Sequence, residues 1–146
     1  MDNADVLTEI DRRFVPLATA GTAPIGDTQV DARQACLVQV NIAEETRKGG
    51  VPPHRLSALL DRFAAATHAT CVGLMLIPPL SDDAGATKRH FAALRELAER
   101  EAAVDRPNVA LSELSMGMSS DFVDAIAEGA TMVRVGTAIF GTRAGR

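Results

Sequence analysis

The sequence has no tryptophan and no tyrosine, and its 15 lysine and arginine residues are outnumbered by 19 aspartate and glutamate residues. Nucleic-acid-binding proteins generally need a cationic surface and aromatic side chains on which bases stack. The composition therefore argues against nucleic acid as a partner. The sequence also lacks an apolar run approaching the ~18 residues of a membrane span, and its acidic start contains no apolar signal core. We expect a cytoplasmic protein without membrane contact.

Cysteine is scarce as well, since Cys36 and Cys71 are the only two. Each begins an apolar run typical of a buried strand, where a small thiol packs well. We expect neither a disulfide nor a metal site. The 146 residues, 47% of them hydrophobic, suffice for one domain with a core.

Strand-like and helix-like segments alternate along the chain. In residues 1–34 the spacing of apolar residues predicts a short amphipathic helix, which a long connection rich in glycine, proline and threonine follows. Residues 35–146 then repeat the order strand, loop, helix, which is typical of right-handed βαβ units and a parallel sheet. The fold class is α/β. Strands are predicted at 36–42, 71–77, 111–117 and 131–135.

Helix signals lie between these strands. Pro52 and Pro53 can open a helix with a leucine-rich stripe, and a second, longer stripe ends at Ala102. The two aspartates at 82 and 83 are expected to cap that second helix. The segment Ser119, Ser120 and Asp121 supplies capping side chains for a third helix, and Gly129 stands where a left-handed C-terminal cap is wanted. Asp121 is interpreted as a capping residue only, because its carboxylate favours the start of a helix but would repel a bound anion such as phosphate.

Two parallel architectures fit this pattern, a doubly wound open sheet and a TIM-type (β/α) barrel. The first strand is followed by AEETRKGG, which lacks the G-x-G-x-x-G fingerprint of a dinucleotide fold. Barrels commonly hold phosphate with the loops after their last two strands, and those loops here read GMSS and GTAIFG. Ser119 and Thr137 add hydroxyl donors to their main-chain N–H groups. We therefore interpret residues 35–146 as the C-terminal half of a barrel, its last four βα units, since a whole barrel needs about 250 residues.

The segment LSMGMSSDFVDAIAEGATMVRVGTAIFGTR, residues 114–143, resembles the C-terminal signature of the pyridoxal phosphate homeostasis proteins. These proteins are single-domain relatives of the alanine racemase N-terminal barrel. The resemblance continues upstream through QVNIAEETRKGG at 39–50 and GLMLIPP at 73–79. It covers nearly everything from Leu37 to Arg143.

The resemblance implies a site for pyridoxal phosphate (PLP). Ser119 matches the family's serine donor to the cofactor phosphate, Gly136 and Thr137 match further phosphate donors, and Arg134 matches the arginine that faces the pyridine nitrogen. A guanidinium is only a donor and stays protonated, so the nitrogen opposite it stays unprotonated. The ring is then a poor electron sink, which suits carrying or buffering the cofactor at least as well as turnover, and members of the family resemble carriers more than enzymes. No catalytic residue is expected.

The resemblance also places the family's Schiff-base lysine on an early strand of the barrel, before the matching part. The sequence has two lysines. Lys48 matches a family loop lysine with no covalent role, and Lys88 is expected to be a solvated helix residue. Any PLP bound here is therefore expected to be non-covalent.

Simpler roles exist for several of these residues. Ser119 can serve as a helix cap without binding a ligand. A strand arginine such as Arg134 usually pairs with a carboxylate at the rim. Gln39 and Asn41 either line the pocket or hydrogen-bond within the barrel. The histidines at 54, 68 and 90 share no motif and are expected at the surface.

Three hypotheses for function follow. The first is a truncated PLP-binding homeostasis protein, which keeps the phosphate loops and lacks the covalent lysine. The second is one half of a split PLP enzyme that a lysine-bearing chain completes. The third is an assembly module that binds no cofactor. Four strands, apolar on both faces, cannot close a barrel, so we expect a homodimer, a larger homo-oligomer or a complex with a complementary N-terminal half.

Overall fold

The computed structural model describes residues 4–13, 33–79 and 83–141. Its four strands form one sheet in the order β1-β2-β3-β4, and every neighbouring pair is parallel. The predicted α/β class with a parallel sheet is therefore confirmed. The elements along the chain are α1 (Ala4–Arg13), β1 (Gln34–Gln39), α2 (Pro53–Ala64), β2 (Ala69–Met75), α3 (Ala84–Ala102), β3 (Val109–Met118), α4 (Phe122–Ala127), β4 (Met132–Arg134) and α5 (Thr137–Phe140).

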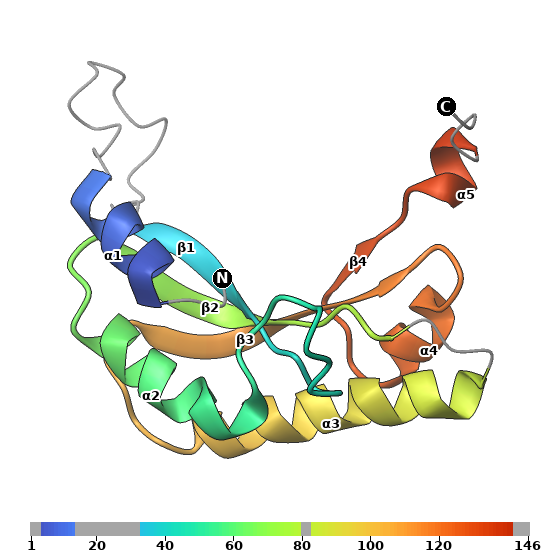
Figure 1. Cartoon of the computed structure of the whole chain (residues 1–146), viewed down its shortest axis with the longest axis horizontal. Coiled ribbons are helices and arrows are strands. Elements are labelled where there is room, and N and C mark those ends of the chain that lie inside the picture. Colours follow the sequence, from blue (N-terminus) through green and yellow to red (C-terminus); the bar gives the residue numbers. More distant parts are fainter. Residues whose placement is uncertain (1–3, 14–32, 80–82, 142–146) are drawn as a thin grey trace, which may run out of the picture.

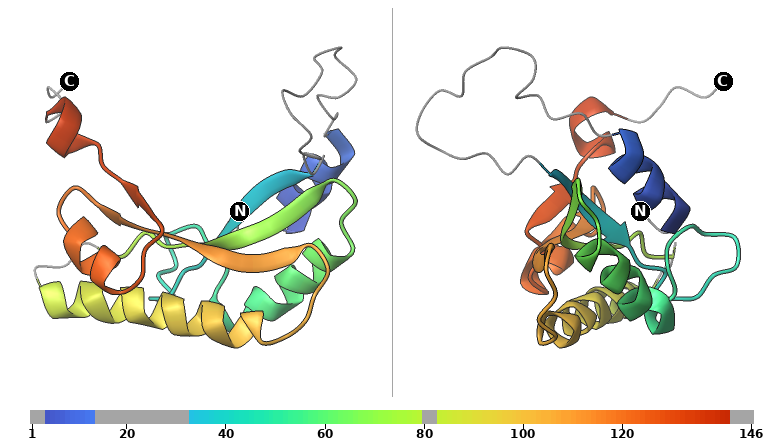
Figure 2. Two further views of the ribbon diagram at one scale, coloured as in Figure 1. Left: turned by 180° about the vertical axis from the view of Figure 1, so that it is seen from behind. Right: turned by 90° about the vertical axis from the view of Figure 1, so that its left-hand side faces the viewer.

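The helices α2, α3 and α4 lie together on one side of the sheet (Figure 1). The sheet curves so that its two ends, β1 with α1 and β4 with α5, rise on the opposite side. The views from behind and from the side give the same trough-like arrangement (Figure 2). Along the described residues, no helix is both long and apolar enough to cross a membrane.

The helices follow the predicted signals closely. Pro53 begins α2, whose buried stripe consists of Leu56, Leu59, Leu60 and Phe63. The Asp83 carboxylate accepts from Gly85 N at 2.8 Å and caps α3 as predicted, while Asp82 lies outside the described residues. The α3 stripe ends sooner than predicted, because Ala102 is exposed.

The strands begin or end a few residues away from their predicted bounds. β1 ends at Gln39, and Val40 forms only an isolated bridge with Val51. The reason is that the loop 41–50 folds back on the strand end, where Asn41 N donates to Val51 O at 2.9 Å and Val51 N donates to Gln39 O at 2.9 Å. β3 starts two residues before its predicted start, and β4 is reduced to three residues.

The core fills the space between the sheet and α2 and α3. Its fully buried members include Val38, Leu60, Phe63, Leu74, Phe91, Leu94 and Met116, and Leu7 of α1 joins the same cluster. Burial of each large apolar side chain stabilises the fold by about 1.5–3 kcal/mol. Cys36 and Cys71 are register partners on β1 and β2; both thiols are free and buried. Burial raises the pKa of the Cys71 thiol to about 11.

The face of the sheet away from α2 and α3 is more polar than predicted. Gln39 alternates with the buried Val38 and Val40, so its side chain lies on that opposite face. Ser115 takes the same place between Leu114 and Met116 on β3. The prediction of strands apolar on both faces is therefore wrong for β1 and β3.

Gly117 lets β3 run directly beneath α4. Its φ is +95°, and a Cβ there would lie 2.6 Å from Ala125 Cβ and 3.1 Å from Phe122 Cα. A side chain at this position meets both backbone strain and a clash. The residue therefore fixes how closely the end of β3 approaches α4.

We expect Gly117→Ala to lower the free energy of unfolding by about 1–3 kcal/mol, because the new methyl group has no space. Urea denaturation measures this change. Gly136→Ala is the matched control, since Gly136 has φ −116° and a Cβ there meets nothing within 4 Å. Equal stability of the two variants would contradict the tight β3–α4 contact.

Candidate functional site

The ends of β3 and β4 bring the two predicted loops together. Met118 and Arg134 are register partners at the carboxyl ends of these parallel strands. Beyond them, Ser119 Oγ accepts from Gly136 N at 3.2 Å and from Ala138 N at 3.3 Å. We call residues 119–121 and 135–138 the loop pair. The structure thus places Ser119, Gly136 and Thr137 side by side, with Arg134 one residue before the second loop.

Ser119 does not cap α4. The N-cap residue of that helix is Asp121, and its side chain makes no capping hydrogen bond. Instead Asp121 Oδ1 accepts from Met118 N at 2.6 Å and closes the turn after β3. The capping role predicted for both residues is therefore wrong, because the serine hydroxyl is engaged by the second loop and the carboxylate by the strand before it.

Arg134 lies along the polar face of the sheet. Its Nη2 donates to Leu76 O at 2.8 Å, and its Nη1 donates to Ser115 Oγ at 2.9 Å and Ser115 O at 3.3 Å. In the part of the chain that the structure describes, no carboxylate forms an ion pair with it. Burial lowers the pKa of the Arg134 guanidinium, and the charge of Asp121 opposes that shift. The group remains a cation at neutral pH because its ordinary pKa lies so high.

The second loop presents main-chain donors at the surface. Gly136 and Thr137 are both exposed, and no protein atom lies within 4 Å of a Cβ built on Gly136. Two amide groups, Gly136 N and Ala138 N, point at one oxygen, that of Ser119. Convergent N–H groups and hydroxyls are the donors that proteins use to bind phosphate and other anions.

Gln39 and Asn41 brace the loop after β1. Gln39 Nε2 donates to Gly49 O at 2.8 Å. Asn41 Nδ2 donates to Glu45 O at 2.9 Å, and its Oδ1 accepts from Glu45 N at 3.1 Å. Of the two alternatives left open by the sequence, hydrogen bonding within the fold describes both side chains.

Neither lysine has a free side chain at the loop pair. Lys48 Nζ lies 2.7 Å from Glu45 Oε2 and donates to Pro78 O at 3.0 Å. Lys88 is half-exposed on α3 and lies 3.8 Å from Glu128. The histidines share no cluster, and among the described residues no group of three potential metal ligands occurs. His54 is exposed as predicted, whereas His68 and His90 are half-buried.

Ser115 is a site residue that the sequence analysis missed. It is 4% exposed and accepts from Arg134 through its hydroxyl. Its position on the same strand face as Arg134 could have been found from the alternation of side chains along β3.

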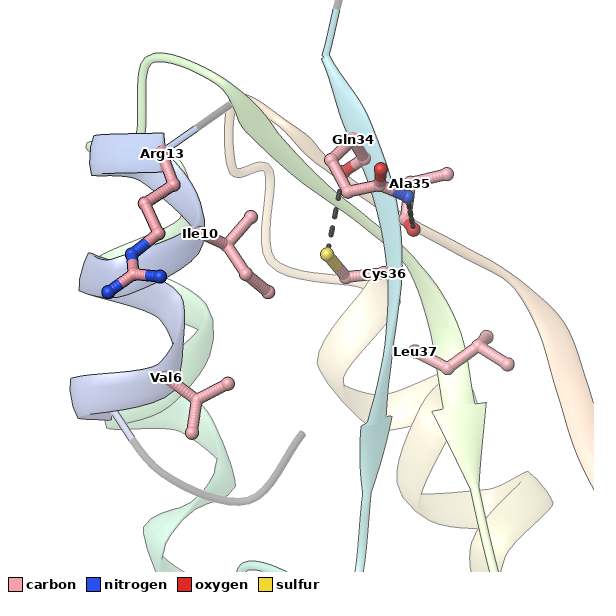
Figure 3. A pocket seen from close by; sticks show the side chains of 7 residues that line it. All are labelled: Val6, Ile10, Arg13, Gln34, Ala35, Cys36 and Leu37. Atoms are coloured by element: carbon pink, nitrogen blue, oxygen red, sulfur yellow. Dashed lines mark hydrogen bonds between the residues drawn. The ribbon is translucent and has the colours of Figure 1, made fainter. Parts of the chain in front are cut away.

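A groove of about 570 Å³ lies at the other end of the molecule, between α1 and the edge strand β1. Val6, Ile10 and Arg13 line it from the helix, and residues 34–37 line it from the strand (Figure 3). Cys36 Sγ is engaged there with Gln34 O at 3.5 Å. This groove is separate from the loop pair, which lies beyond β3 and β4 (Figure 1).

Comparison with known proteins finds relatives over most of the chain. Residues 23–144 match the family described as "Alanine racemase, N-terminal domain". A pyridoxal phosphate homeostasis protein of Aquifex aeolicus is 44% identical over 110 residues, which are 75% of this chain and 47% of that protein. The protein of the same name from Vibrio cholerae is 34% identical over 142 residues, 97% of this chain and 57% of that one. The chain spans about half the length of these curated relatives.

Solved structures of similar proteins give the same fold. PipY of Synechococcus elongatus, in its structure without PLP, matches with a TM-score of 0.76 and 34% identity, over 97% of this chain and 59% of that one. The PipY structure with PLP bound matches with a TM-score of 0.73 and 33% identity, over 97% and 58% of the two chains. The predicted TIM-barrel-type half barrel is thereby confirmed. The chain belongs to the alanine racemase N-terminal domain family, and the curated relatives that it resembles are named pyridoxal phosphate homeostasis proteins.

Proposed function

We propose that this chain binds PLP non-covalently through the loop pair and acts as a carrier without catalysis of its own. The observation that carries the proposal is the convergence of Gly136 N and Ala138 N on Ser119 Oγ. A hydrogen bond to a charged group contributes about 1.5–3 kcal/mol, against about 0.5–1.5 kcal/mol for a neutral pair. A phosphate oxygen therefore competes well with the serine hydroxyl for these two amides.

The donor set fits a phosphate monoester. Gly136 and Ala138 offer main-chain N–H groups, and Ser119 and Thr137 offer hydroxyls that can turn to donate. The space beside Gly136 is open to an approaching anion, because no protein atom would contact a Cβ there. The PLP bound to the related PipY supports the choice of this phosphate ester among others.

Arg134 is proposed to face the pyridine nitrogen. It stays charged and is hydrogen-bonded to neutral oxygens of Leu76 and Ser115. When bound, PLP supplies an electron sink for carbanion chemistry, and protonation of its ring nitrogen strengthens that sink. A guanidinium cannot accept a hydrogen bond from a protonated ring nitrogen, and its positive charge disfavours protonation of that nitrogen. The arrangement favours storage or delivery over turnover, in keeping with relatives named homeostasis proteins.

The lysines support a non-covalent mode. An amine must be unprotonated and placed at the ligand to attack its aldehyde. Lys48 is engaged by Glu45 and by Pro78 O, and Lys88 lies on the outer helix α3. We place the protein in the cytoplasm, where PLP-dependent enzymes would draw on such a carrier.

We also propose that the described sheet associates with further strands. β1 and β4 are the outer members of its strand order, and four strands cannot close a barrel. The partner is a second copy of this chain or a complementary N-terminal half.

Ser119→Ala and Thr137→Ala should each weaken PLP binding by about 1–3 kcal/mol, because each removes a hydroxyl bonded to a charged phosphate. Isothermal titration with PLP, and with pyridoxal as the ligand without phosphate, measures the effect. Ser120→Ala is the matched control, since Ser120 is exposed on the same loop and, among the described residues, it is Ser119 rather than Ser120 that bonds to the second loop. Equal losses for PLP and pyridoxal, or no loss for either, would contradict the phosphate site.

Borohydride treatment of the chain mixed with PLP should leave less than one covalent adduct per molecule, because neither lysine is placed at the loop pair. Intact-mass spectrometry counts the adducts. The Lys48→Ala chain should give the same low yield and bind PLP with unchanged affinity. A single stoichiometric adduct at Lys48 would overturn the non-covalent mode.

A further inference from the structure

Arg134 is held in place by groups of two strands to which it does not belong. From the end of β4, its Nη2 donates to Leu76 O, just beyond β2, at 2.8 Å. Its Nη1 donates to Ser115 Oγ on β3 at 2.9 Å. Leu76 N in turn donates to Ser115 O at 3.1 Å. The guanidinium therefore joins the ends of three neighbouring strands, and its direction is set within the chain itself.

The Ser115 hydroxyl is the side-chain acceptor in this arrangement. The other acceptors, Leu76 O and Ser115 O, are main-chain groups that every amino acid carries. Ser115 lies on the face of the sheet that α2, α3 and α4 leave uncovered (Figure 1), yet the residue is only 4% exposed. Its hydroxyl is buried beside Arg134, so water competes little for the hydrogen bond between them.

The hydroxyl orients the guanidinium and leaves its charge in place. A carboxylate at position 115 would also accept from Arg134, but it would compensate the positive charge. A side chain without an acceptor would leave the charge and lose the orientation. An arginine that is not held must be ordered by the ligand, which lowers the affinity by about 2–10-fold. A neutral acceptor at position 115 is therefore the choice that both aims the cation and preserves it.

We propose that Ser115 is a positioning residue for the ligand ring, which aims the Arg134 guanidinium at the ring nitrogen and, being neutral, keeps that nitrogen unprotonated. The inference rests on the proposed function and deepens it, because Ser115 acts on the ring while the loop pair acts on the phosphate. The two roles are separable with a ligand that has a phosphate and no ring.

Isothermal titration of the full 146-residue chain with PLP, alone and in competition with inorganic phosphate, tests the proposal. Ser115→Ala should weaken PLP binding by about 2–10-fold, because the ligand must then order the arginine. The affinity for inorganic phosphate should stay unchanged, whereas Ser119→Ala should weaken both ligands. Ser115→Thr keeps the hydroxyl and should restore PLP affinity.

Ser112→Ala is the matched control for Ser115→Ala. Ser112 lies on the same strand, is exposed, and directs its Oγ to Val72 O at 3.4 Å. Its substitution should change neither the PLP affinity nor the phosphate affinity.

A double substitution tests whether Ser115 acts through Arg134. In the Arg134→Gln chain, Ser115→Ala should cost no further PLP affinity, because the side chain that it positions is already absent. Circular dichroism checks that each variant is folded.

Ser115→Asp adds a spectroscopic test with PLP that carries ¹⁵N at the ring nitrogen. The new carboxylate compensates the guanidinium charge, so the pKa of the ring nitrogen should rise by about one pH unit relative to the unsubstituted chain. The ¹⁵N chemical shift during a pH titration measures it. If Ser115→Asp does not fold, the comparison of Ser115→Ala with Ser115→Thr decides.

The outcomes separate this inference from the function on which it rests. A chain that binds no PLP, or whose bound PLP inorganic phosphate does not displace, overturns the proposed function and this inference with it. Where PLP binds and phosphate competes, four results overturn the role of Ser115 alone. They are unchanged PLP affinity in Ser115→Ala, equal losses for PLP and phosphate, no recovery in a folded Ser115→Thr chain, and a full further loss in the Arg134→Gln chain. An unchanged ring-nitrogen pKa in a folded Ser115→Asp chain counts with these.

Discussion

The parallel pairing of β3 with β4 is the constraint on which the candidate site depends. It sets Met118 beside Arg134 at the same edge of the sheet, so the loops that follow must start side by side. Gly117 then allows the chain to pass beneath α4, and the Asp121 carboxylate closes the turn by accepting from Met118 N. Ser119 is delivered to the second loop by backbone geometry, before any ligand contributes.

The charged and the neutral hydrogen-bond donors at this edge of the sheet lie in different places. Arg134 is held by Leu76 O and Ser115, and these neutral oxygens leave its charge uncompensated. Asp121 is the nearby carboxylate whose charge acts on it, yet Asp121 Oδ1 is committed to Met118 N. A cation at the sheet and neutral N–H donors at the loop pair suit a ligand with a ring at one end and a phosphate at the other.

Much of this arrangement could be predicted from the sequence. Apolar periodicity gave α2, proline and aspartate marked the starts of α2 and α3, and Gly129 occupies the expected left-handed position with φ +94°. The pairing of the two loops also followed from strand order. Hydrogen-bond partners could not be predicted, since a serine before a helix has equal local access to the helix and to a neighbouring loop. The end of β1 was predicted wrongly for a similar reason: Val40 and Asn41 fit a strand by composition, but the loop 41–50 turns back and Val51 O accepts from Asn41 N.

The polar residues on the face of the sheet away from α2 and α3 restrict what can cover that face. A sheet face built only of apolar side chains would bind any apolar surface, but this face carries Gln39, Ser115 and Arg134, all three of which are hydrogen-bonded within the chain. Of the nine large hydrophobic residues that are exposed in the described chain, seven lie on α1, α4, β4 and α5. Partners that would stack face to face must bury the Arg134 charge, which costs several kcal/mol without a paired group. Strands added at the edges of the sheet would leave that charge uncovered, where the ring of a ligand could reach it, so closure of the barrel and formation of the ligand site favour the same geometry.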